Sequence, residues 1–306
     1  MLKKIIFMGT PEFSVPSLEI ISNSKHKILC VYTQPPKKKY RGQNIIDSPV
    51  SQFAIKNNLK VRTPQQLDNE KDYEFFIKNK PDLVVVVAYG QIISKRFLDI
   101  PNIQFINLHA SLLPKWRGAA PIERSIMNLD KKTGISIMKI VPELDAGPCM
   151  KQIPIKIDDT TTAGNLKKEL SRIGAKSLIE SINVIEEGKA KFINQEHELA
   201  TYAKKISKSE TRIEWNYSAK KIIAKINALN PFPGAWFKHN NNRLKILKAV
   251  EIDKSGKAGQ LINDDLIIAC SENAIQILKI QKEGKKVLDK DQFLVGNKIK
   301  KGTQLI

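Results

Sequence analysis

The chain has 306 residues, a length at which two domains can each bury a hydrophobic core. Hydrophobic residues make up 42% and charged residues 27%, which excludes a disordered or fibrous protein. Lys and Arg outnumber Asp and Glu by 51 to 31, a net charge of +20 that favours a polyanionic partner, either nucleic acid or an acidic membrane face. A surface that is basic only for solubility is the alternative explanation.

The first half of the chain alternates between strand-like and helix-like segments. Residues 83–88 (LVVVVA) are continuously apolar, as in a central parallel strand that is covered on both faces. The predicted strands are 3–8, 27–32, 83–88, 103–108 and 134–140, and the predicted helices begin at 14 and cover 48–58, 122–129 and 165–187. This alternation predicts an α/β fold, a Rossmann-like and mostly parallel sheet with helices on both faces.

Beyond about residue 189 the pattern changes to short strands separated by polar turns. The predicted strands are 243–250, 260–268 and 274–280, and one helical pattern covers 218–229. Short strands with a single helix are typical of a small barrel or sandwich, and we expect an OB-like β-barrel. The predicted domains are an α/β domain over 1–189, a linker over 190–205 and the barrel over 206–306. The last 101 residues hold 19 Lys and Arg against 10 Asp and Glu, so positive charge is densest there.

The spacing of the cysteines and the length of the apolar runs indicate in which cellular compartment the protein is found. Cys30, Cys149 and Cys270 lie far apart without a CxxC pair, which excludes a disulfide framework and disfavours a zinc site. The apolar run at 5–8 is too short for a signal peptide, and 83–88 is far below the roughly 20 residues of a membrane span. We therefore expect a soluble cytoplasmic protein with no membrane partner.

Polar side chains lie at the end of the strand over 103–108. Asn107 and His109 are two residues apart, so they point to the same side of that strand. Ligands bind where the strands of such sheets end, and the loop over 141–148 supplies Asp145. An amide can hold an oxyanion, an imidazole can move protons near neutral pH, and a carboxylate can orient the imidazole. Together they suit acyl transfer to an amine, although each alone is compatible with a purely structural role.

Other reaction classes lack their motifs. The first strand is followed by Gly9-Thr10-Pro11 and not by the G-x-G-x-x-G of a nicotinamide enzyme. The sequence contains no Walker loop, HExxH or G-x-S-x-G, and nothing around Ser111 resembles a nucleophile elbow. No ligand cluster is present to hold a metal, so we expect none.

A basic loop, QPPKKKYRGQN over 34–44, connects a predicted strand to a predicted helix. It contains Lys37, Lys38, Lys39 and Arg41. Arg41 presents a planar fork that can hydrogen-bond RNA, and Tyr40 can stack on a base. A solvated linker is the alternative, but the global charge favours a phosphate-binding arm.

Five segments together resemble the methionyl-tRNA formyltransferase family. They are MGTPEF over 8–13, QPP…RG…DSPV over 34–50, NLHASLLPKWRGAAPIERSI over 107–126, TGISIMKIVPELDAGPCM over 133–150 and ALNPFPGAWF over 228–237. HASLLPKWRGAAP is the most specific of them, since SLLP alone indicates only the wider group of folate-dependent formyltransferases and hydrolases. The resemblance runs essentially from end to end of the chain.

The resemblance implies transfer of a formyl group from 10-formyltetrahydrofolate to the α-amine of methionyl initiator tRNA. It assigns the chemistry to Asn107, His109 and Asp145, the folate site to Ser111, Leu112, Leu113 and Pro114, and tRNA contacts to Lys37, Lys38, Lys39 and Arg41. It makes 1–189 the formyltransferase domain and 206–306 a tRNA-binding domain, and we expect a monomer.

One departure and two rival functions accompany the resemblance. The family often has more basic residues directly after the RG pair, where this chain has Gln43 and Asn44. A formyltransferase for an amino sugar nucleotide and a non-catalytic RNA-binding protein are the alternatives. The sugar enzyme would have less use for the charge, and the binding protein no use for the three reactive side chains.

Overall fold

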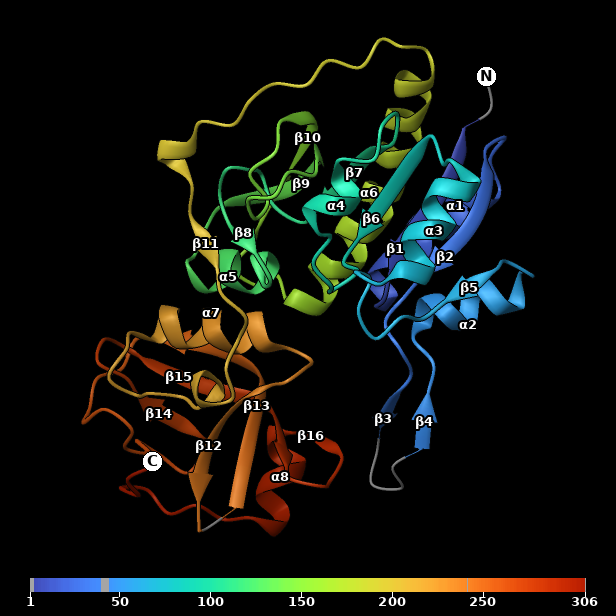
Figure 1. Cartoon of the computed structure of the whole chain (residues 1–306). Coiled ribbons are helices and arrows are strands. Elements are labelled where there is room, and N and C mark those ends of the chain that lie inside the picture. Colours follow the sequence, from blue (N-terminus) through green and yellow to red (C-terminus); the bar gives the residue numbers. More distant parts are fainter. Residues whose placement is uncertain (1–2, 40–43, 241, 306) are drawn as a thin grey trace. The chain divides into compact units, whose positions relative to one another are not determined.

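The computed structural model describes residues 3–39, 44–240 and 242–305 (Figure 1). The chain forms two compact units that interleave along the sequence. The first unit comprises Met1–Gly118, Gly134–Ile155 and Lys167–Tyr202. The second comprises Ala119–Thr133, Lys156–Leu166 and Ala203–Ile306. No helix in the described ranges is long and apolar enough to cross a membrane.

A seven-stranded sheet in the order β10-β9-β7-β6-β1-β2-β5 forms the centre of the first unit. Its strands are β1 (Lys4–Gly9), β2 (Lys27–Tyr32), β5 (Val61–Arg62), β6 (Leu83–Val87), β7 (Gln104–His109), β9 (Lys132–Lys139) and β10 (Cys149–Lys156). The five strands from β7 to β5 pair in parallel, whereas β9 pairs with β7 in the antiparallel sense. The predicted Rossmann-like, mostly parallel sheet is therefore confirmed.

Helices cover both faces of this sheet, as predicted. They are η1 (Glu12–Ser14), α1 (Val15–Ser22), α2 (Pro49–Lys56), α3 (Glu70–Asn79), α4 (Lys95–Leu98), α6 (Ala163–Glu186) and η2 (His197–Leu199). On one face, Phe76 of α3 stacks on Phe105 of β7 with ring centroids 6.3 Å apart. On the other face, α6 approaches Leu108 so closely that a Cβ on Gly174 would lie 2.7 Å from its Cδ2.

Four short strands lie outside this sheet. The strand β3 (Lys37–Lys39) pairs with β4 (Asn44–Ile46) in an antiparallel hairpin, and β8 (Arg117–Gly118) pairs with β11 (Tyr202–Ala203). Figure 1 shows the β3–β4 hairpin extending away from the seven-stranded sheet.

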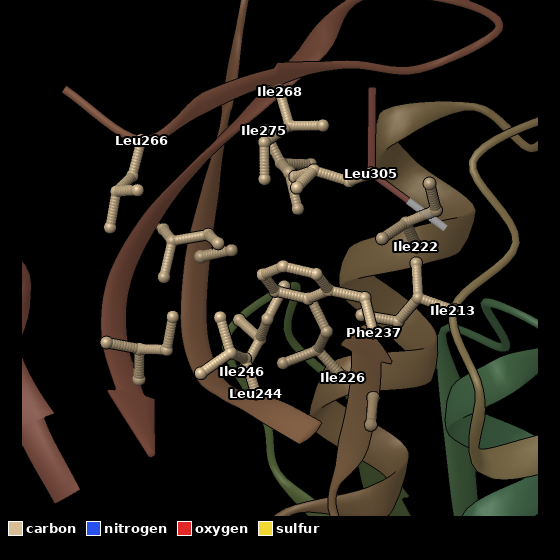
Figure 2. Close-up of a cluster of buried hydrophobic side chains, with 14 of the residues drawn as sticks. Ile213, Ile222, Ile226, Phe237, Leu244, Ile246, Leu266, Ile268, Ile275 and Leu305 are labelled. Atoms are coloured by element: carbon tan, nitrogen blue, oxygen red, sulfur yellow. The ribbon is translucent and has the colours of Figure 1, made fainter. Parts of the chain in front are cut away.

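The second unit packs a helix on an antiparallel sheet. Its elements are α5 (Pro121–Met127), η3 (Ser209–Thr211), α7 (Ala219–Leu229), β12 (Ala235–His239), β13 (Asn242–Ile252), β14 (Ile267–Ala269), β15 (Ala274–Lys282), β16 (Val287–Asp289) and α8 (Lys290–Gly296). Ser218 caps α7 by accepting a hydrogen bond from the Lys221 N–H. Ile222 and Ile226 of α7 pack with Phe237 in one buried cluster (Figure 2).

The expected OB-like barrel is wrong, because the described strands form no closed barrel. Strands run in the order β12-β13-β15-β14, and the three-residue β14 and β16 share the remaining edge of β15. The other edge of β12 carries one bridge, between Trp236 and Arg212, and no further strand. The outer edge of β14 carries one isolated bridge, between Ile268 and Leu261, and no described strand joins the two edges of the sheet.

The strand predicted over 260–268 is also wrong, since only its last residues join β14. The side-chain oxygen of Asn263 accepts hydrogen bonds from the N–H groups of Asp265 and Ile267, at 3.0 and 3.4 Å. Leu266 has a left-handed backbone with φ of +53°. This local turn, typical of Asn, interrupts the extended conformation. The strands predicted over 243–250 and 274–280 are confirmed as parts of β13 and β15.

Candidate active site

Strand β7 places Asn107 and His109 on the same face of the sheet. His109 is its last residue and is buried, with 6% of its surface exposed, while Asn107 is half-buried. The side chain of Asn107 makes no hydrogen bond to any other described residue, so its amide N–H groups remain available to a substrate. The strand therefore presents one amide donor and one imidazole side by side.

Asp145 lies beside the second of these residues, His109. Its Oδ2 lies 3.6 Å from Nδ1 of His109 and accepts a 2.8 Å hydrogen bond from the N–H of Gly118. The Asp145 side chain is 15% exposed and that of His109 is 7% exposed, so water screens the pair only weakly. The carboxylate is fixed by the backbone and faces the imidazole.

The other ring nitrogen of His109 defines its tautomer. Nε2 lies 2.9 Å from the carbonyl oxygen of Trp116, and because a carbonyl only accepts, Nε2 carries a proton. In neutral His109 the atom facing Asp145, Nδ1, is then unprotonated. Nδ1 is then the ring atom that can accept a proton, and it faces the Asp145 carboxylate.

Asp145 reaches His109 by a route that parallel-sheet reasoning does not predict. Since β9 runs antiparallel to β7, the loop after it starts where Ile140 N–H donates to the carbonyl of Phe105, toward the amino end of β7. The loop then folds back on β9. A Cβ on Gly147 would lie 1.9 Å from the carbonyl oxygen of Lys139, so only glycine fits at this return. Asp145 adopts a left-handed backbone, with φ of +48°.

The segment Ser111–Pro114 forms a loop directly after His109. Ser111 is fully buried and its hydroxyl donates to the carbonyl of Lys115 at 2.6 Å. Leu113 is also buried, and its N–H donates to the Ser136 hydroxyl at 3.1 Å. Leu112 and Pro114 are partly exposed. Ser111 and Leu113 thus shape the loop, and the other two present accessible side chains.

Neither Cys149 of β10 nor Ser111 presents an activated nucleophile. Burial raises the pKa of the Cys149 thiol to about 11, although Arg117 opposes the shift. Cys149 is therefore a neutral thiol near pH 7, and only thiolates are strong nucleophiles. The hydroxyl of Ser111 is occupied by its hydrogen bond to the backbone. The arrangement suits direct transfer between two substrates without a covalent enzyme intermediate.

The basic residues predicted to contact RNA lie in and beside the β3–β4 hairpin. Lys37, Lys38 and Lys39 form β3, and Arg41 lies outside the described residues. Lys37 is exposed, and its ammonium group donates to the side-chain oxygen of Gln34. This first part of the hairpin is therefore anchored to Gln34, in the segment between β2 and β3. Lys37, the one of these four whose side chain is described, makes no hydrogen bond or ion pair with His109 or Asp145.

The second unit has a basic surface on the outer face of its sheet. Phe237 points into the core, so Trp236 and Lys238 point outward, and Lys245 and Arg243 lie directly opposite them on β13. The Arg243 guanidinium lies 4.2 Å from the centre of the Trp236 ring. Interleaved cations and an aromatic ring are typical of surfaces that bind nucleic-acid backbones and bases. We call these four residues the 236–245 surface.

Sequence reasoning missed two polar residues that border the site. Arg117 and Gln195 are 3% and 8% exposed, and the Gln195 side chain accepts from the guanidinium at 2.7 and 3.1 Å. Gln195 lies in the segment predicted to be a linker. The sequence offers one signal for this pair: Arg117 directly precedes the small and apolar residues of 118–121, and an arginine buried there needs a polar partner.

Comparison with known proteins places the chain in a family. Residues 3–182 match the formyl transferase model and residues 205–298 match the formyl transferase C-terminal domain model. The methionyl-tRNA formyltransferase of Pelagibacter ubique (strain HTCC1062) is 49% identical over all of this chain and 99% of that protein. The one from Caulobacter sp. (strain K31) is 42% identical over 99% of both chains.

Solved structures of similar fold have much lower sequence identity. HypX from Aquifex aeolicus, in complex with tetrahydrofolic acid, has a TM-score of 0.64 and 17% identity, covering 96% of this chain and 47% of that one. WlaRD, a sugar 3N-formyl transferase, also has a TM-score of 0.64, with 20% identity over 94% of this chain and 100% of that one. These likenesses support the fold alone. The two family models and the full-length relatives show that the chain belongs to the formyl transferase family and, within it, to the methionyl-tRNA formyltransferases.

Proposed function

We propose that this chain transfers the formyl group of 10-formyltetrahydrofolate to the α-amine of methionine esterified to initiator tRNA. The observation that carries the proposal is the arrangement of His109 Nδ1 beside the Asp145 carboxylate, with the Asn107 amide on the same face of β7. It occurs in a chain whose relatives are named methionyl-tRNA formyltransferases.

The reaction needs a group that accepts the proton of the amine, a hydrogen-bond donor to the oxyanion, and a proton for the leaving nitrogen. A free α-amine has a pKa of about 8. Esterification of the methionine carboxyl group lowers this pKa, so the neutral amine is available as a nucleophile near pH 7. Its attack on the formyl carbon forms a C–N bond and a tetrahedral oxyanion, to which Asn107 donates. One such donor contributes about 10²–10³ to the rate.

Collapse of the oxyanion breaks the bond between the formyl carbon and N10 of the folate. His109 takes the amine proton on Nδ1 and passes it to the departing N10, so the transfer of formyl consumes no net proton. Asp145 stabilises the imidazolium between the two steps, as a carboxylate does beside a catalytic histidine.

Exposed apolar side chains in the loops that follow β6 and β9 suit a folate. Leu144, next to Asp145, is 63% exposed, and Ile92, in the loop that follows β6, is 90% exposed. Apolar side chains so exposed suit a planar ring system, because burying them against it removes apolar surface from water. With Ser111, Leu112, Leu113 and Pro114 shaping the adjoining loop, these residues are our proposed folate site.

We assign tRNA binding to two surfaces. The basic loop, with Lys37, Lys38, Lys39 and Arg41, contacts the acceptor end, and the 236–245 surface contacts the phosphate backbone. The net charge of +20 supports this assignment, since Lys and Arg that neutralise phosphates supply most of the affinity for RNA. We further propose that 206–306 is the tRNA-binding domain, joined to a catalytic domain over 1–189 through 190–205, and that the chain acts as a cytoplasmic monomer.

A formyl-transfer assay with three acceptors tests the function. The purified chain is incubated with 10-formyltetrahydrofolate and methionyl initiator tRNA, uncharged initiator tRNA or a nucleotide-linked amino sugar. Formyl should appear only on the charged tRNA. Preferential formylation of the sugar would instead make the chain a sugar-nucleotide enzyme, and tRNA binding without any formylation would make it a binding protein.

A further inference from the structure

A buried polar network holds the backbone around Asp145. The side-chain nitrogen of Gln195 donates to the carbonyl oxygens of Asp145 and Gly147, at 2.9 and 2.7 Å. Its side-chain oxygen accepts from Nε and Nη2 of Arg117, at 3.1 and 2.7 Å. All the strong hydrogen-bonding positions of this amide are therefore used, at a residue only 8% exposed.

Arg117 determines which way the Gln195 amide points. A guanidinium only donates and a carbonyl only accepts, so the amide oxygen must face Arg117 and the amide nitrogen must face the loop. Asp145 needs such support, because its φ of +48° is a conformation that non-glycine residues rarely adopt. Its carbonyl is held by Gln195 and its carboxylate by the N–H of Gly118, the residue next to Arg117.

The same part of the chain also supports His109. The Thr201 hydroxyl accepts from the N–H of Trp116 at 2.9 Å, and the Thr201 carbonyl accepts from the N–H of Arg117 at 2.8 Å. The carbonyl of Trp116 in turn accepts from His109. Gln195 and Thr201, which lie between the two regions matched by the family models, thus contact the supports of both reacting side chains.

We propose that Gln195, oriented by Arg117, is a positioning residue for formyl transfer, so that the segment predicted to be a linker contributes to the active site through Gln195 and Thr201. The network fixes the backbone of Asp145 so that its carboxylate stays beside Nδ1 of His109. The proposal rests on the proposed function, because it takes Asp145 as a reacting group. Displacement of such a group by about 1 Å can lower a rate by about a hundredfold.

Gln195→Glu is the most informative substitution. It keeps an acceptor for Arg117, so the buried guanidinium is not left unpaired, but it replaces the two donors with an oxygen that repels the carbonyls of Asp145 and Gly147. We expect kcat to fall about 10- to 100-fold, with KM for tRNA and for 10-formyltetrahydrofolate within about twofold of the wild-type values. Arg117→Lys, which loses the fork but keeps the charge, should lower kcat in the same way by a smaller factor.

The matched control is Glu196→Gln, at the exposed neighbour of Gln195. The Glu196 side chain makes no hydrogen bond or ion pair to another described residue, so kcat should not change. Melting temperatures are measured for every variant, and kinetics are compared at a temperature where each is folded. An equal loss of kcat in Glu196→Gln would show that any change in this segment disturbs the enzyme, and would overturn the proposal.

A double-mutant cycle separates this proposal from the proposed function. If Gln195 acts through the carboxylate, Gln195→Glu should change kcat by less than about twofold in an Asp145→Ala background. Wild-type kcat in Asp145→Ala alone would refute the role of Asp145 in the proposed function. A large effect of Asp145→Ala with wild-type kcat in Gln195→Glu, or multiplicative effects in the double variant, would overturn the positioning role alone.

Discussion

The carboxylate of Asp145 is held by the backbone N–H of Gly118 at 2.8 Å, whereas Nδ1 of His109 lies 3.6 Å from the same oxygen. The negative charge is therefore in place before the imidazole takes up a proton. A charged group that is already oriented does not have to reorganise during the reaction. Much of the catalytic stabilisation of a transition state arises from such groups. Nδ1 is thus the atom of His109 that faces this fixed carboxylate.

His109→Ala tests this arrangement. Removing the imidazole deletes the proton acceptor, so we expect kcat to fall by about 10²–10⁴. Affinity for methionyl initiator tRNA should stay within about twofold of wild type, because the charge of the tRNA-binding surfaces is unchanged. Single-turnover formylation and equilibrium tRNA binding measure the two quantities. Turnover near the wild-type value would remove His109 from the mechanism.

Arg41→Ala tests recognition by the basic loop. Loss of one phosphate contact should weaken the use of methionyl initiator tRNA and lower the slope of log affinity against log salt by about 1. The measurement is kcat/KM for the initiator tRNA, together with binding at several salt concentrations. Free methionine and an elongator aminoacyl-tRNA serve as control acceptors. An equal effect on all three acceptors would contradict a recognition role.

The sequence predicted β6, at the centre of the sheet, and β7, which carries Asn107 and His109, because their patterns are local. Strand β6 is apolar throughout, and Asn107 and His109 alternate with buried residues of β7. Helix α3 was not predicted because its fully buried residues are only Asp72 and Phe76, which form no continuous apolar stripe. The helix is held on the sheet by the contact of Phe76 with Phe105, and this tertiary contact cannot be read from the sequence of the helix.

The parts of the site that were not predicted depend on long-range pairing. Nothing in the residues of β9 encodes its antiparallel direction, so the return of the loop to Asp145 could not be foreseen. Gln195 carries no pattern because its partners, Asp145 and Arg117, lie 50 and 78 residues away in the sequence. The expected barrel failed for a related reason, since closure depends on which edges meet and not on the number of strands.

Arg243→Glu tests the 236–245 surface. Charge reversal here should raise the dissociation constant of tRNA and lower the salt slope by about 1, while kcat at saturating tRNA is unchanged. The stacking of Arg243 on Trp236 contributes about 0.5–1 kcal/mol, so the variant should remain folded. Lys78→Glu, an equal charge change at an exposed position of α3, is the control. If both variants lose the same affinity, the net charge and not this surface is responsible.

Glu210→Gln tests how acid destabilises the second unit. Hydrogen bonds from Arg124, with a smaller contribution from Ser207, lower the pKa of Glu210 to about 2 from its ordinary value of 4.5. A carboxyl whose pKa is lowered by folding stabilises the folded state at every pH above the pKa that it has in the unfolded chain. This contribution to stability disappears as the pH falls from 4.5 toward 2. Because the side chain is 38% exposed, the contribution is screened to about 1 kcal/mol or less.

At pH 7 the Glu210→Gln variant should therefore melt about 2–4 °C below wild type, and the two melting temperatures should converge near pH 2. Glu272→Gln, whose side chain has no hydrogen bond or ion pair within the described residues, should melt like wild type throughout. A difference for Glu210→Gln that stays constant between pH 7 and pH 2 would show that ionisation of this carboxyl is not the source of the stability.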